Sequence, residues 1–145
     1  MHRRRLIAAS FAFLGILCIS GSQAEDPANP TPGGIRLLPG YQHQKEVGKD
    51  TRIGKIWNEA GLTLRYDIGR GAGNMVKGQE KTNVLWSKEQ VVDGHPVHLA
   101  LTKDRMLFVT FPETSANFYA KTKSDEEVVE ILLMVLTYAP PATPK

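Results

Sequence analysis

The chain alternates strictly between apolar and polar residues from position 62 to 68, and this pattern limits its fold more than any other feature. The apolar positions are Leu62, Leu64, Tyr66 and Ile68, and the residues between them are Thr63, Arg65 and Asp67. A period of two is that of a β-strand with one buried face, because successive side chains point to opposite sides. The segment therefore predicts a sheet with one face covered.

Further strand-like runs surround this segment and are separated by short turns. The runs are 51–57, 83–92, 95–102 and 106–111. Asp93-Gly94 is a favoured two-residue hairpin turn, and the segment 58–61 ends in a glycine. Runs joined in this way predict an antiparallel meander. We therefore expect a mostly antiparallel sheet of five or six strands.

The segment SDEEVVEILLMVLTY, residues 124–138, predicts a helix. Ser124 and Glu127 form a capping box, and Asp125 and Glu126 suit the positive end of a helix. The following residues are apolar on nearly every side, which is typical of a buried helix, and the run is too short to span a membrane. The expected fold class is α+β: one domain over residues 35–138, with a buried C-terminal helix against the sheet.

The first 24 residues have the three parts of a secretory signal peptide. Arg3 to Arg5 form a basic start, residues 6–19 are apolar, and Ser22-Gln23-Ala24 has small residues at the cleavage positions. We expect an exported protein, periplasmic or extracellular, with no membrane span after cleavage. Residues 25–34 and 139–145 are rich in proline and predict a disordered tether and a disordered tail.

Charge and cysteine content exclude several classes of function. The chain has 18 basic and 15 acidic residues, and three of the basic ones lie in the signal segment, so the remainder has 15 of each. This balance does not fit a nucleic-acid binder. Cys18 is the only cysteine and also lies in the signal segment. After cleavage, disulfides, thiol catalysis and cysteine-based zinc sites are therefore excluded.

The stretch YDIGRGAGN, residues 66–74, is the one candidate for a binding loop. Its candidate residues are Gly69, Arg70, Gly71, Gly73 and Asn74. A dinucleotide loop needs a third glycine where Asn74 stands, and a helix that the following sequence does not predict. Backbone N–H groups and Arg70 could still form a small anion nest. The alternative, which the sequence favours, is a turn in which glycines adopt positive φ.

The three histidines outside the signal segment do not indicate a metal or catalytic site. His95 and His98 lie three apart in a strand pattern, where they point to opposite faces, and His43 is distant in sequence. No serine occurs in a nucleophile elbow. We therefore nominate no catalytic residue, metal or cofactor. The aromatic residues on the strand patterns fit a core, or else a ligand pocket.

These observations favour an exported binding or interaction module whose partner is an unknown protein or small molecule. One alternative is a small periplasmic hydrolase or metal-assisted enzyme using His95 or His98. Another is a carrier of a small apolar ligand held between sheet and helix. A concave site with converging histidines would favour the enzyme, an apolar cavity the carrier, and a filled core the interaction module.

Overall fold

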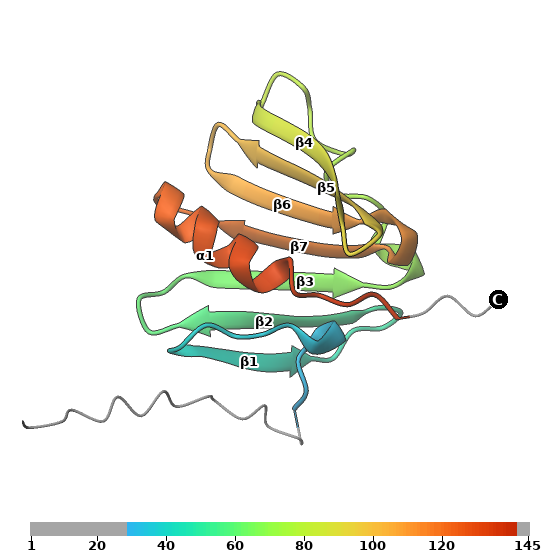
Figure 1. The fold of residues 1–145 in the computed structure, drawn as a ribbon, viewed down its shortest axis with the longest axis vertical. Coiled ribbons are helices and arrows are strands. Elements are labelled where there is room, and N and C mark those ends of the chain that lie inside the picture. The colour runs from blue at the N-terminus through green and yellow to red at the C-terminus, as the bar shows by residue number, and fades with distance from the viewer. Residues whose placement is uncertain (1–28, 142–145) are drawn as a thin grey trace, which may run out of the picture.

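A computed structural model describes residues 29–141 as one seven-stranded antiparallel sheet with a single α-helix on one face (Figure 1). The strand order is β1-β2-β3-β7-β6-β5-β4, and every neighbouring pair is antiparallel. The elements are β1 (Tyr41–Glu46), β2 (Arg52–Asn58), β3 (Thr63–Ile68), β4 (Val84–Val92), β5 (His95–Thr102), β6 (Met106–Phe111), β7 (Ala116–Lys121) and α1 (Asp125–Val135). The α+β class and the antiparallel sheet are confirmed.

The sheet has seven strands, so the predicted number of five or six was too low. The unpredicted strands are β1 and β7. β1 reads YQHQKE, in which only Tyr41 is buried, so no alternating apolar pattern marks it. β7 reads ANFYAK; two of its three core-facing residues are alanines, and a buried asparagine lies on its other face. Both strands depend on backbone pairing with neighbours, which local residue patterns do not reveal.

Two meanders make up the sheet, and they join in its centre. β1 to β3 follow one another, as do β4 to β7, and β7 pairs with β3. The hairpin turn between β4 and β5 is the one that the sequence predicts, with φ of 49° at Asp93 and 83° at Gly94. The chain leaves β3 in the middle of the sheet and reaches the far edge strand β4 through residues 69–83, called here the 69–83 loop.

The capped helix α1 covers the sheet with one side only. The Ser124 side chain accepts a hydrogen bond from the Glu127 N–H, as the capping box predicts. Four residues face the sheet and are buried: Val128, Ile131, Met134 and Val135. Val129 and Leu133 are 53% and 57% exposed. The prediction of a helix buried all round was therefore wrong, because a lone helix on a sheet has no neighbour for its outer side.

The core lies between α1 and the sheet and is filled with side chains. Residues with at most 1% exposure include Ile56, Leu64, Leu107, Phe111 and Phe118 from the strands and Ile131 and Met134 from α1. Tyr138, just after the helix, packs edge-on against Phe111 and Phe118 with ring centroids 4.8 and 5.2 Å apart. This aromatic cluster fixes the C-terminal end of the helix on the central strands.

The segment before β1 also packs against this face. Thr31, Pro32 and Ile35 are buried, and the Ala139 N–H donates to the Gly33 carbonyl at 2.9 Å. Part of the predicted tether therefore belongs to the folded domain. The predicted signal segment, residues 1–24, lies outside the described residues. Within residues 29–141 there is no cysteine, and no helix has the length and apolar character needed to cross a membrane.

Candidate functional site

The 69–83 loop lies across the face of the sheet opposite α1, called here the open face. Strand alternation places Phe118 toward the helix and Asn117 on the open face. The Asn117 side chain binds the loop at three points: its amide donates to the carbonyls of Ala72 and Gly73 at 3.1 and 3.2 Å, and its oxygen accepts from the Met75 N–H at 3.1 Å. The loop thus covers the part of the open face around Asn117.

Asn117 is fully buried and fully hydrogen-bonded. Its oxygen also accepts from the Thr110 hydroxyl at 2.7 Å, so both donors and both acceptor positions of the amide are used. A buried asparagine with every position satisfied specifies one geometry, because any shift would leave a polar group without a partner. Asn117 therefore positions the loop on the sheet.

The loop itself fits the turn that the sequence favours. Gly69 and Gly73 have φ of 149° and 64°, which glycine adopts without strain, whereas Gly71 does not require positive φ. The carbonyls of Ala72 and Gly73 point to Asn117, and Arg70 is exposed. Gly73 thus turns its carbonyl to Asn117, and the Gly69 N–H donates to the Ser115 carbonyl at 3.2 Å. Anion binding by Gly69, Arg70, Gly71, Gly73 and Asn74 stays a prediction.

The loop brings one of its predicted site residues, Asn74, to His98. The Asn74 oxygen accepts from the Lys77 N–H at 3.0 Å, which directs its amide NH₂ toward His98 Nδ1 at 3.2 Å. Nδ1 is then the acceptor, and the proton of a neutral ring lies on Nε2. His98 Nε2 is 3.7 Å from a carboxylate oxygen of Glu89, and the His98 side chain is 11% exposed. His98 is thus held beneath the loop rather than presented to solvent.

The other two histidines lie elsewhere. His95 forms an exposed pair with Glu113, with Nδ1 2.9 Å from the carboxylate oxygen. His43 lies on β1, at the edge of the sheet opposite β4 and β5, and its Nε2 is 3.0 Å from the Tyr66 hydroxyl. Among the described residues, no three His, Cys, Asp or Glu side chains are grouped closely enough to hold a metal ion.

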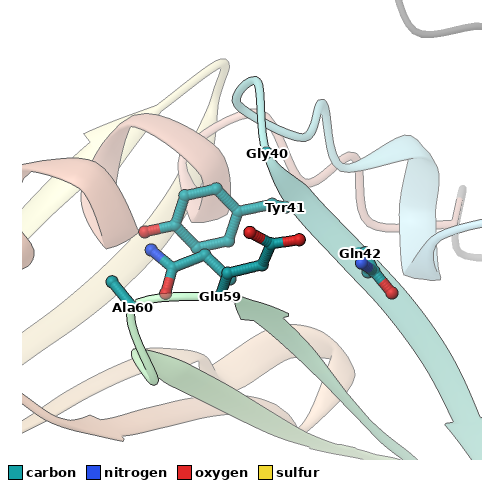
Figure 2. Close-up of a pocket in the computed structure, with 6 residues that line it drawn as sticks. Gly40, Tyr41, Gln42, Glu59 and Ala60 are labelled. Atoms are coloured by element: carbon teal, nitrogen blue, oxygen red, sulfur yellow. The ribbon is translucent and has the colours of Figure 1, made fainter.

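A shallow hollow of about 480 Å³ lies beside the start of β1 and the β2–β3 turn (Figure 2). Six residues line it: Gly40, Tyr41, Gln42, Asn58, Glu59 and Ala60. The Tyr41 hydroxyl donates to a carboxylate oxygen of Glu130 on α1 at 2.5 Å. Burial, and then the Glu130 carboxylate, raise the pKa of Tyr41 well above its usual value. The phenol is therefore a neutral structural link between β1 and α1.

Beyond the loop, the open face carries an array of cationic and aromatic side chains, and the neighbouring row holds Glu46, Ile53 and Asp67. We call the array of cationic and aromatic side chains the open-face array; it consists of Lys55, Trp57, Thr63, Arg65, Met106, Phe108, Tyr119 and Lys121, all at least partly exposed. Its residues alternate along β2, β3, β7 and β6 with residues of the buried core. The open-face array and the residues that the 69–83 loop covers thus lie on the same face of the sheet.

Register places four of these side chains in one row across four neighbouring strands. Lys55 is opposite Arg65, Arg65 is opposite Tyr119, and Tyr119 is opposite Phe108. Neighbouring strands are about 4.8 Å apart, so the row is about 14 Å long. The Phe108 and Tyr119 rings stack with centroids 6.4 Å apart. In the next row, Trp57 lies opposite Thr63.

No protein-family model, curated protein or solved structure matches this chain.

The open-face array is the feature that sequence reasoning missed. The sequence assigns the aromatic residues to a core or a pocket, because β3 borders β7 only in the folded sheet. The one available signal is parity in 62–68, where Thr63 and Arg65 fall on the side of the strand away from Leu62, Leu64, Tyr66 and Ile68. In 51–57, Lys55 and Trp57 share their side with the apolar Ile53, so the pattern gives no such signal.

Proposed function

We propose that this chain is an exported binding module that holds its ligand or partner on the open-face array. Export rests on the predicted signal segment at 1–24. Binding rests on one observation: four adjacent strands present three aromatic rings, a methionine and three cations on a sheet face that no second layer covers within the described residues. Exposed aromatic groups gathered on one surface are typical of interaction sites.

The arrangement of the residues gives less support to the two alternative functions, an enzyme and a carrier of an apolar ligand. An enzyme using His95 or His98 would need one of them beside a reactive group in an accessible site. His95 lies in an exposed pair with Glu113, while His98 is held by Asn74 beneath the loop. A carrier would need space between sheet and helix, where Ile56, Leu64, Ile131 and their neighbours pack with no exposure. These arrangements support a binding surface more than a catalytic or enclosed site.

A binding screen with paired variants tests the proposal. The chain without residues 1–24 is applied to an array of soluble glycans and peptides, beside the variant Trp57→Ser/Phe108→Ser. The control Val129→Ser/Leu133→Ser removes two exposed apolar side chains from α1, on the other face. We expect at least one component to bind the wild type and the control but not the array variant.

A charge variant keeps this test valid if the aromatic variant does not fold. Lys55→Gln/Arg65→Gln changes only two surface groups and leaves the core untouched. Circular dichroism and urea unfolding establish that each variant is folded before binding is compared. If no component distinguishes either array variant from the control, the open-face array is not the binding surface and the proposal is wrong.

A further inference from the structure

The two edges of the sheet differ in how far they are covered. At the β1 edge, the Asn29 side-chain amide donates a hydrogen bond to the His43 carbonyl at 2.8 Å. The Tyr41 N–H, at the start of the same strand, donates to the Leu38 carbonyl at 3.1 Å. β4 forms the other edge and is the longest strand of the sheet, with nine residues (Figure 1). Among the described residues no strand pairs with its outer side, so β4 is the edge that is open to pairing.

The hairpin turn after β4 shows which of its residues point their backbone outward. Val92 and His95 flank this two-residue turn and therefore form a hydrogen-bonded pair of the β4–β5 ladder. Hydrogen-bonded pairs alternate along an antiparallel ladder, so the N–H and C=O groups of Ser87, Glu89 and Val91 point away from β5. Within residues 29–141, no other backbone group bonds to these outward groups. A row of three residues thus presents free donors and acceptors.

These outward groups define the occupant of the edge as an extended strand. Donors and acceptors on every second residue are the complement of another strand's edge, which is how a sheet gains a strand from a partner. β4 also exposes two large apolar side chains, Leu85 by 57% and Val91 by 72%. Leu85 stands in a bulge, and from Trp86 to Val92 the pairing with β5 is regular. The edge therefore has both the backbone and the apolar groups of a pairing site.

The order of residues in β4 fits a second copy of β4. The strand reads VLWSKEQVV, which is apolar at both ends and polar in the middle. Two copies that pair antiparallel around Lys88 bring the apolar start of each against the apolar end of the other. Leu85 and Val91 each lie three positions from Lys88, so the two most exposed apolar residues of the strand come to opposite positions. A two-fold interface requires such self-complementarity.

The polar residues of the strand fit the same register. Ser87 stands opposite Glu89 of the second copy, where a hydroxyl can donate to a carboxylate, and symmetry repeats this pair. In the register on either side, Leu85 would stand opposite an acid, Glu89 or Asp93. The register centred on Lys88 is therefore the one that matches apolar with apolar and donor with acceptor.

We propose that two copies of this chain pair through their β4 edges, antiparallel and centred on Lys88, into one continuous sheet. The inference goes beyond the proposed function and does not depend on it, because the open-face array lies on other strands. The pairing keeps both open faces on the same side, since opposite residues of a ladder point to one face. Two open-face arrays would then contact one large partner together, which raises the effective affinity.

Repulsion between two lysines keeps this pairing weak and reversible. In the centred register, the Lys88 side chains of the two copies lie opposite each other, where like charges are unfavourable. Lys88→Thr should therefore tighten the dimer roughly threefold, within the range of such cross-strand effects. Added salt should tighten the wild-type dimer for the same reason. Both effects are opposite to those of a dimer held by ion pairs.

Sedimentation equilibrium of the chain without residues 1–24, from micromolar to millimolar concentration, tests the pairing. We expect a monomer–dimer equilibrium. Ser87→Pro removes an outward N–H but no bond of the β4–β5 ladder, a position that tolerates proline. It should weaken the dimer roughly tenfold or more, because each copy loses a hydrogen bond. Leu85→Lys/Val91→Lys should weaken it too and replaces the proline variant if that one does not fold, whereas Val129→Ser/Leu133→Ser on α1 is the control.

Single cysteines test the register, because Cys18 is the only cysteine of the chain and lies in the predicted signal segment. Lys88→Cys places two sulfurs on a non-hydrogen-bonded pair, whose Cα atoms are about 4.5 Å apart, within reach of a disulfide. In Gln90→Cys, the matched control, the two cysteines are offset by four residues, or roughly 14 Å along the strand. We expect mild oxidation to link Lys88→Cys into a covalent dimer and to leave Gln90→Cys largely unlinked.

Each outcome decides for or against the second copy. A monomer at every concentration overturns the inference, and so does a dimer that the edge variants do not weaken, because it forms elsewhere. Equal cross-linking of the two cysteine variants contradicts the register. An extended peptide that binds a monomeric chain, and no longer binds Ser87→Pro, would assign the edge to a foreign strand and overturn the dimer. The screen with open-face variants reads the proposed function separately from all of these results.

Discussion

At the scale of single residues, Asn117 shows how one side chain holds a long connection in place. Loops that cross a sheet must satisfy their backbone polar groups where they are covered. Asn117 does this for Ala72, Gly73 and Met75 at once, and the Thr110 hydroxyl completes its own hydrogen bonds. The hydrogen-bond partners of Asn117 lie in a glycine-rich stretch that resembles a ligand-binding loop. This structural role is therefore easy to mistake for ligand binding.

Replacing Asn117 by alanine should therefore destabilise the fold and loosen the loop. The change leaves two carbonyls and one N–H of the loop without partners, each worth roughly 1–3 kcal/mol if it stays buried. We expect a loss of about 3 kcal/mol in urea unfolding, because part of the loop gains water in exchange, and faster proteolysis within residues 69–83. Asn83→Ala is the matched control, since Asn83 binds through its backbone carbonyl and its side chain is exposed. Equal stability of the two variants would contradict this role.

The Tyr41–Glu130 link predicts a specific alkaline weakness. Burial, together with Glu130, raises the pKa of the folded-state phenol, whereas an unfolded tyrosine ionises near pH 10. Above about pH 10 the unfolded chain loses this proton and the folded chain keeps it, so the contribution of the link is complete below pH 10 and falls as the pH rises.

Urea unfolding between pH 8 and 11.5 measures this effect, and Tyr41→Phe should show a shallower decline than the wild type. The decline should not vanish, because burial also raises the pKa of Tyr66. Tyr119→Phe, on the open face, serves as control and should follow the wild-type curve. A Tyr41→Phe curve parallel to that of the wild type would show that the phenol is not protected in the folded state.

At the scale of elements, α1 shows how the sheet decides which apolar residues of a helix are buried. The sequence is apolar on nearly every side from Val128 to Leu136, so composition alone does not distinguish inner from outer positions. The sheet contacts the side of Val128, Ile131 and Val135 and leaves Val129 and Leu133 in solvent. One-sided burial follows from the geometry of a single helix on a single sheet face.

Alanine substitutions along α1 should reproduce this division. Ile131→Ala removes a side chain with no exposure and should cost roughly 2–5 kcal/mol, whereas Leu133→Ala should change the unfolding free energy by less than about 0.5 kcal/mol. Ser124→Ala should cost about 1 kcal/mol through loss of the cap. Urea unfolding of all three variants checks the order; a large loss at Leu133 would mean that its outer side is covered by another surface in solution.

At the scale of the whole molecule, the two ends of the described chain close the core together. Ile35 and Tyr138 are buried, the Ala139 N–H binds the Gly33 carbonyl, and the Arg36 N–H binds the Thr137 hydroxyl at 2.8 Å. A substituent on Gly33 would contact the Tyr138 ring at 2.4 Å, so glycine is needed for this close approach. Residues about 100 positions apart thus support each other over the central strands.

Two substitutions at Tyr138 separate its ring from its hydroxyl. The ring packs on Phe111 and Phe118, whereas the hydroxyl oxygen is buried without a hydrogen-bond partner. Tyr138→Ala should lower the unfolding free energy by roughly 3–5 kcal/mol, as large aromatic truncations do. Tyr138→Phe should be neutral or stabilising by up to about 1 kcal/mol, because it removes an unsatisfied polar group. A clear loss in Tyr138→Phe would show that the hydroxyl has a partner in solution.

The sequence by itself determined the features that depend on neighbours along the chain. The alternation from Leu62 to Ile68, the Asp93-Gly94 turn and the Ser124 cap all act over a few residues, and the structure has each of them. The residues of the glycine-rich stretch likewise favour a turn, and the positive φ of Gly69 and Gly73 agrees with it.

Only the tertiary structure decided which segments meet across the sheet. β7 lies between β3 and β6, and its pairing with β3 joins residues about 50 positions apart. That pairing places Arg65 beside Tyr119 and creates the open-face array. It also places Asn117 where its side chain binds the loop that follows β3. Such contacts form because backbone ladders and burial favour the assembled sheet as a whole, and no short stretch of sequence contains both partners.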